Sequence, residues 1–121
     1  MKKKIMPLVV FAGIMILAAF WTPAARAADA PQRIEITAKR FSFDPGEITL
    51  KKGQPVVLVL KSADVAHGLE FKELKINVKV KAHGTSEIQF TPEKTGDFIG
   101  QCSVFCGSGH GSMKMTLHVV N

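Results

Sequence analysis

The chain has 121 residues, 46% of them hydrophobic, which suits one folded domain and excludes a disordered chain. Its formal net charge of +6 is uneven, because four basic residues and no acidic ones lie within the first 27 residues. Without that segment the net charge is about +2, and no phosphate-binding loop or basic patch interleaved with aromatic residues is present, so nucleic-acid binding is excluded.

The first 27 residues have the layout of a secretory signal peptide. Three lysines precede the apolar stretch 5–21, and the small residues Ala25 and Ala27 form a cleavage site. The alternative is an uncleaved membrane anchor, because the uncharged stretch 5–25 approaches the roughly 20 residues that a spanning helix needs. Both alternatives predict a periplasmic or otherwise exported domain, residues 28–121, which in the second case stays anchored to the inner membrane.

The exported part alternates between short apolar–polar segments and turns, which predicts strands at 33–39, 47–50, 55–62, 74–80, 86–92, 95–101 and 113–120. The apolar run 55–62 is typical of a central strand, and Ile88, Phe90 and Phe98 are expected in the core. No segment keeps the 3.6-residue period of an amphipathic helix. Six to eight strands at this spacing predict an all-β fold, a Greek-key sandwich or barrel.

The last predicted strand has a clear parity. One face has Met113, Met115, Leu117 and Val119, and the other has Lys114, Thr116 and His118. Met113 is therefore expected to face the core, and His118 the solvent. Met115 is interpreted as core packing, since methionine fills cores more often than it binds metals.

The segment GQCSVFCGSGHGSM, residues 100–113, holds two cysteines, a histidine and a methionine. In an exported protein the simplest interpretation of Cys102 and Cys106 is a disulfide, although a short loop gains little from one. The C-x3-C-x3-H spacing is not a common zinc spacing, and methionine is a poor zinc ligand. A dithiol oxidoreductase normally has its reactive cysteine at the start of a helix, and no helix is predicted.

Copper fits these residue types best, because thiolate, imidazole and thioether are its ligands in electron-transfer sites. A second imidazole is available from His67 in SADVAH, directly after the apolar strand, because loops at one end of a Greek-key sandwich converge. A site with one copper ion in a blue-copper geometry needs only one thiolate, which leaves the second cysteine unexplained. A site with two ions bridged by both thiolates uses every donor.

These two segments are similar to the binuclear copper A (CuA) site of cytochrome c oxidase subunit II and of the cupredoxin-like domain of nitrous-oxide reductase. The segment FSFDPGEITLKKGQPVVLVLKS also resembles the cupredoxin strands before the first histidine ligand, and the similarity covers residues 32–120. The resemblance implies a cupredoxin fold, two copper ions and six ligand residues. They are the thiolates of Cys102 and Cys106, the imidazoles of His67 and His110, the thioether of Met113 and the backbone carbonyl of Val104.

The sequence departs from the subunit II pattern at several points. Subunit II typically has glutamate where this chain has Val104, and valine cannot serve the magnesium site of that glutamate. Subunit II usually has two transmembrane helices, and this chain has at most one. The docking face of subunit II typically has an aromatic residue, often tryptophan, that receives electrons; the only tryptophan here is Trp21, and Phe41 or Phe43 is expected near that place instead. A stand-alone copper domain is therefore expected.

The resemblance implies an exported one-electron transfer protein and not an enzyme, with a c-type cytochrome and a terminal oxidase or reductase as redox partners. The alternative function is a periplasmic copper carrier or chaperone that holds Cu(I) with the same ligands. Among the remaining polar residues, Asp64 is expected either to orient the His67 loop or to cap a turn. His83 is expected to be a solvated turn residue.

Overall fold

The computed structural model describes residues 30–121, so the predicted signal peptide or anchor lies outside the described residues. The described residues form nine strands: β1 (Gln32–Lys39), β2 (Ser42–Asp44), β3 (Glu47–Lys51), β4 (Val56–Ser62), β5 (His67–Phe71), β6 (Ile76–Val80), β7 (Thr85–Phe90), β8 (Gly96–Gln101) and β9 (Lys114–Val120). Two 3₁₀ turns, η2 (Lys72–Leu74) and η3 (His110–Ser112), accompany them. Within this part of the chain, no helix is long and apolar enough to cross a membrane.

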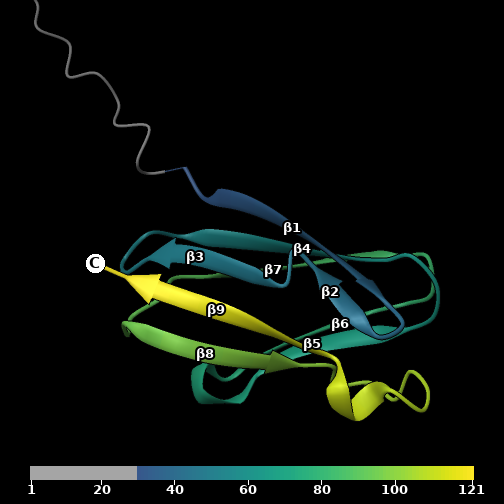
Figure 1. The fold of residues 1–121 in the computed structure, drawn as a ribbon. Helices are drawn as coiled ribbons and strands as arrows, with labels where there is room; N and C mark the ends of the chain where they lie inside the picture. The colour runs from purple at the N-terminus through teal and green to yellow at the C-terminus, as the bar shows by residue number, and fades with distance from the viewer. Residues whose placement is uncertain (1–29) are drawn as a thin grey trace, which may run out of the picture.

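The strands form two sheets that pack on each other as two layers (Figure 1). One sheet has the order β2-β1-β4-β7, and the other has the order β3-β9-β8-β5-β6. The pairs β1–β4 and β3–β9 are parallel, and the remaining pairs are antiparallel. Apolar side chains from both sheets form one core, which confirms the predicted all-β sandwich.

The centre of the first sheet is β4, as its apolar run predicts. This strand lies between β1 and β7, and five of its seven residues are buried. Ile88 and Phe90 were expected in the core but are only half-buried, because their strand β7 is the edge of its sheet. Phe98, on the interior strand β8, is buried as predicted.

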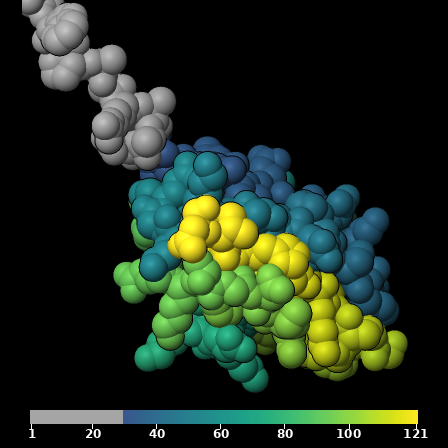
Figure 2. Space-filling model, turned by 60° about the vertical axis from the view of Figure 1, so that its left-hand side comes forward, coloured from purple at the N-terminus to yellow at the C-terminus, as the bar shows by residue number. Residues whose placement is uncertain are grey.

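The predicted parity of β9 is confirmed. Met115, Leu117 and Val119 are buried, and Met113, just before the strand, has no exposed surface. In Figure 2 this strand (yellow) runs along the surface beside β8 (green), with the preceding loop at one end. The outward side of β9 includes His118, which is half-buried between acidic side chains of β8 and β3.

The sequence did not predict two of the nine strands. β2 has only three residues, too few to display an alternating pattern. β5 begins at His67, which was expected in a loop, and four of its five residues are buried. Burial on both faces removes the alternation by which a strand is identified from sequence.

Four chain segments meet at one end of the sandwich, which we call the metal end: residues 39–42, 63–66, 79–84 and 102–113. Register places them together, because His67 pairs with Val80, Lys61 with Thr85, and Gln101 with Lys114. The loop 102–113 lies at the end of the molecule away from the C-terminus (Figure 1).

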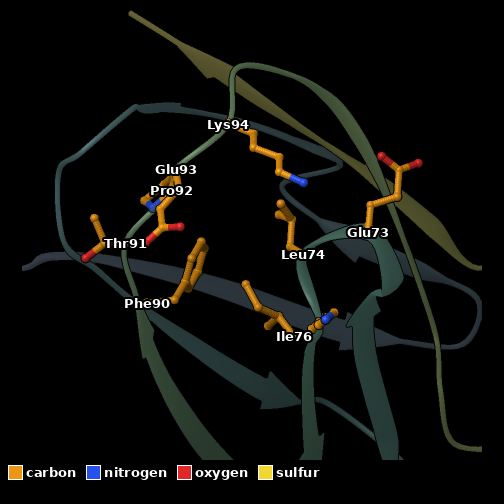
Figure 3. A pocket seen from close by; sticks show the side chains of 9 residues that line it. Glu73, Leu74, Ile76, Phe90, Thr91, Pro92, Glu93 and Lys94 are labelled. Atoms are coloured by element: carbon orange, nitrogen blue, oxygen red, sulfur yellow. The ribbon is translucent and has the colours of Figure 1, made fainter.

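The far end of the sandwich has a pocket of about 350 Å³ between η2 and the β7–β8 loop. Leu74, Ile76 and Phe90 converge on it, and Lys94 reaches over it (Figure 3). Glu73 and Glu93 stand at its edge, so this end has charges of both signs.

Candidate metal centre

Three of the predicted ligands form a compact buried cluster at the metal end. One ligand atom from each of His67, Cys102 and Cys106 lies within 4.8 Å of the others. His67 has no exposed surface, and each cysteine is only 5% exposed. The two Sγ atoms are 3.7 Å apart as free thiols, so the predicted alternative of a disulfide is not what the structure contains.

Cys102 has a nitrogen and an oxygen donor beside its sulfur. Its Sγ atom is 3.9 Å from Nδ1 of His67 and 3.1 Å from the carbonyl oxygen of Val104. The Val104 carbonyl therefore points back toward the thiols, where the resemblance predicts a weak ligand.

Cys106 has the other two predicted donors beside its sulfur. Its Sγ atom is 3.7 Å from Nδ1 of His110 and 3.8 Å from Sδ of Met113. His110 begins η3, and Met113 follows it at the entrance to β9. The four other predicted ligand residues thus surround the two cysteine sulfur atoms, each imidazole beside a different thiol.

The imidazole of His67 is held by Asp64. Nε2 of His67 is 2.6 Å from Oδ1 of Asp64, which also accepts a hydrogen bond of 2.7 Å from the Val65 amide. Oδ2 accepts a hydrogen bond of 2.8 Å from the Arg40 amide. Partial burial opposes ionisation of Asp64, but hydrogen bonds from Arg40, His67 and Val65 outweigh it and lower its pKa to about 2.

The ionised Asp64 determines which nitrogen of His67 is available. A carboxylate only accepts hydrogen bonds, so Nε2 must have the proton, and Nδ1 presents its lone pair toward Cys102. Such a carboxylate–histidine pair is the usual way of fixing a metal-binding imidazole. The structure therefore supports both predicted roles for Asp64, because it orients His67 and also accepts hydrogen bonds from the backbone amides of Arg40 and Val65.

Backbone contacts fix the shape of the cysteine loop. The Cys102 amide donates to the Met113 carbonyl at 3.1 Å, and the Ser103 amide donates to the Gly68 carbonyl at 3.3 Å. Gly68 cannot be replaced freely, because a Cβ atom there would lie 2.0 Å from Oγ of Ser103. The guanidinium Nε of Arg40 donates to the Cys106 carbonyl at 3.2 Å, which fastens the β1–β2 turn to the loop.

The donor set fits copper. Burial raises the pKa of the Cys106 thiol to about 11, and the neighbouring Cys102 adds to this shift, so a metal ion must displace a proton when it binds. Two thiolates, two imidazoles and a thioether are soft and borderline ligands, which select copper over magnesium or calcium, and the Val104 carbonyl adds a single oxygen donor. When bound, copper would supply one-electron redox chemistry at this position.

The other residues that the sequence analysis singled out are not ligands of the proposed metal centre. His83 is exposed in the β6–β7 turn with a left-handed φ of 57°, in agreement with a solvated turn residue. Met115 is buried in the core. Of the two predicted aromatic residues, Phe43 is also in the core, and Phe41 contacts the cysteine loop, where a Cβ atom on Gly109 would lie 2.5 Å from its ring.

Two residues of this region were missed by sequence reasoning. Phe105 is 78% exposed, and its ring centroid is 5.7 Å from that of His110. Its position between the two cysteines was the available signal. Arg40 had no signal, because only the fold brings its side chain to Cys106, 66 positions along the chain.

Comparison with known proteins agrees with this geometry. The family model for the cupredoxin-like domain matches residues 12–118. Cytochrome c oxidase subunit 2 of Thermus thermophilus is 30% identical over 86 residues, which cover 71% of this chain and 64% of that protein. The chain therefore spans less than two thirds of that relative's length.

Two solved structures share the fold. The periplasmic domain of subunit II of cytochrome oxidase from Bradyrhizobium japonicum has a TM-score of 0.68 at 23% identity, covering 76% of this chain and 86% of that one. The metal-binding domain of the Cu(I)-exporting P-type ATPase of Streptococcus pneumoniae, solved with Cu(I), has a TM-score of 0.62 at 25% identity, covering 74% and 85%. With its family-model match, its fold and its His–Cys cluster, the chain belongs to the cupredoxin-like family and is homologous to cytochrome c oxidase subunit II.

Proposed function

We propose that this chain is a one-electron transfer protein that holds two copper ions in a CuA centre. The observation that carries the proposal is the pair of thiols 3.7 Å apart, with a different imidazole beside each sulfur. Both thiolates can then bridge two ions, while His67 and His110 each bind one. Met113 and the Val104 carbonyl would be the weak ligands.

The residues around the thiols suit rapid electron exchange. Asp64 holds His67, the backbone bond between Cys102 and Met113 closes the loop, and Arg40 fastens Cys106. Ligands that are already in place need little rearrangement when the charge of the centre changes. Burial of both cysteines also keeps water from the sulfur atoms.

The proposal includes the place and partners of the protein. The chain would be exported by a signal peptide at residues 1–27, or remain anchored through that segment, with residues 28–121 in the periplasm. Its redox partners would be a c-type cytochrome and a terminal oxidase or reductase. Cytochrome c oxidase subunit 2 as a relative supports this placement, and the protein would carry electrons without being an enzyme itself.

A second function has one specific observation in its favour. A domain of similar fold, that of the Cu(I)-exporting ATPase, was solved with Cu(I). A periplasmic copper carrier would use the same thiols and imidazoles, but would bind and release Cu(I) instead of keeping two ions.

Metal analysis and electron paramagnetic resonance separate the two functions. The full chain is loaded with copper, freed of excess metal and examined in its oxidised form. Two ions per chain that share one unpaired electron give a seven-line hyperfine pattern, which supports the CuA proposal. One ion with a four-line pattern, or a site stable only with Cu(I), contradicts it and favours the carrier.

A further inference from the structure

A second pocket opens directly beside the metal centre, on the side of Val104. It has a volume of about 480 Å³ and is lined by Ala66, Lys79, Val80, Lys81, Gly84, Thr85, Ser86 and Val104. Three of these residues adjoin proposed ligands. Ala66 precedes His67, Val80 pairs with His67, and the Val104 carbonyl is 3.1 Å from Sγ of Cys102.

The charged residues in the lining of this pocket are both basic. Lys79 and Lys81 lie on its wall, and it has no carboxylate among its lining residues. Arg40 extends the positive charge across the cysteine loop to the Cys106 carbonyl. The nearby carboxylate of Asp64 accepts hydrogen bonds from His67 and from two backbone amides, and it is not among the residues that line the pocket.

Other parts of the surface differ in this respect. Another pocket beside the centre, lined by Cys102 and His110, includes Glu70 and Glu73 together with Lys72. The far end also has both signs of charge around its pocket (Figure 3). Of these three pockets, only the one on the Val104 side has lysines and no carboxylate among its lining residues.

A large apolar side chain lies on the same loop as Val104. Phe105 follows Val104 in the chain, is 78% exposed, and its ring contacts that of His110. Aromatic residues, phenylalanine included, are enriched in the core of protein interfaces, inside a polar rim. The same exposed ring contacts the proposed copper ligand His110, so a partner bound on it would be close to the centre.

We propose that the Val104 side of the metal end binds a redox protein with an acidic contact surface, which inserts a carboxylate between Lys79 and Lys81 and packs an apolar centre on Phe105. The inference rests on the proposed electron transfer, since it specifies the chemistry of the partner. A free small anion would bind the lysines alone and would leave the exposed phenyl ring of Phe105 without an apolar contact. An anionic membrane does use both features, but it would cover the ring beside His110 and separate the centre from soluble partners.

Charge reversal tests the proposal on the full, copper-loaded chain. The probes are two soluble c-type cytochromes, one of net negative and one of net positive charge, mixed with the reduced protein in a stopped-flow experiment. The doubly substituted K79E/K81E protein is compared with the matched control K51E/K52E, which makes the same change of net charge at the other end of β3 and β9. At about 0.01 M salt the Debye length is roughly 30 Å, so charge effects are then largest.

The wild-type protein is expected to react faster with the acidic cytochrome and to slow as salt is added. K79E/K81E is expected to lower that low-salt rate constant by about tenfold, within the range of electrostatic steering, and K51E/K52E to leave it within about twofold. Equal effects of the two variants, or a faster reaction with the basic cytochrome, overturn the proposal.

Two further measurements distinguish loss of protein docking from loss of the metal centre and from membrane binding. The copper content and the electron paramagnetic resonance spectrum are recorded for every variant, so that loss of the centre, which would contradict the CuA function, is distinguished from loss of docking. Sedimentation with phosphatidylglycerol vesicles tests the membrane. Vesicle binding that K79E/K81E abolishes, with unchanged cytochrome rates, overturns the proposal of a protein partner.

Discussion

Asp64 and His67 form a hydrogen-bonded pair of 2.6 Å in which the carboxylate is half-buried and the imidazole has no exposed surface. The three-residue separation places the carboxylate within the β4–β5 loop, residues 63–66, and the imidazole at the first position of β5. The pair fixes the proton on Nε2 and aims Nδ1 at the thiols, so a residue outside the ligand set determines the orientation of a ligand.

Replacing Asp64 by alanine is expected to weaken copper binding by about 10- to 100-fold, the usual cost of losing a residue that orients a metal ligand. Competition with a Cu(I) chelator measures this change. Asp64→Asn keeps one acceptor for His67 and should fall between the two. An affinity equal to wild type in Asp64→Ala would show that the loop holds His67 without the carboxylate.

Replacing either cysteine by serine is expected to abolish the seven-line spectrum, because a hydroxyl is a poor bridging ligand for copper. The spectrum of the copper-loaded Cys102→Ser and Cys106→Ser chains provides the measurement. His118→Gln is the matched control, since His118 lies on the outward face of β9 and bonds to Asp97. A retained seven-line pattern in either cysteine variant would exclude a bridging role for that residue.

Gly100 is packed against the core side chains of β5. A Cβ atom at this position would lie 2.7 Å from the ring of Phe71 and 2.8 Å from Cδ1 of Leu69. Gly100→Ala is expected to lower the free energy of unfolding by about 1–3 kcal/mol, as overpacking does. Urea denaturation measures it, with Gly111→Ala as control, because a Cβ on Gly111 meets nothing within 4 Å. Equal stability of the two variants would show that β5 moves aside at no cost.

His118 links three strands in a pH-dependent way. The hydrogen bond between its Nδ1 and Asp97, at 2.5 Å, raises the pKa of His118, and Glu47 at 3.6 Å from Nε2 adds to the shift. The protonated form is therefore favoured by folding. Its contribution to stability is complete below the unfolded pKa of about 6.5 and is lost as the pH rises through the higher folded pKa.

The melting temperatures of the wild-type and His118→Gln proteins test this expectation over a range of pH. The wild type should exceed the variant at acidic pH, and the difference should shrink toward alkaline pH. Both residues that bond His118 are well exposed, so the effect is expected to be small and to weaken with salt. A difference that grows with pH would contradict the raised pKa.

Local sequence patterns predicted much of this structure. The apolar run of β4 and the alternation of β9 depend on side chains within one strand, so they were visible in the sequence. The ligand types in residues 102–113 were equally visible, because five of the six proposed ligand residues lie close together in this one loop. His67 required the further argument that loops converge at one end of a sandwich.

The rest depends on contacts between distant segments. The Arg40 side chain meets Cys106 only because β1 and the cysteine loop end on the same side of the sandwich. The pocket between Lys79, Lys81 and Val104 likewise exists only after β5 and β6 have paired. The periodicity of a sequence does not predict contacts between distant segments. It does not predict strand order either, so the position of β7 at the edge of its sheet, which left Ile88 and Phe90 half-buried, was not visible in the sequence.

The hydrogen bond from the Cys102 amide to the Met113 carbonyl has an evolutionary consequence. It closes a loop that contains five of the six proposed ligand residues, so their mutual spacing is set within a short continuous stretch. Substitutions across the two sheets can accumulate without disturbing that spacing, provided that His67 stays at the start of β5. Selection can therefore retain the loop while the scaffold diverges, and lineages with little overall identity can keep the same chemistry.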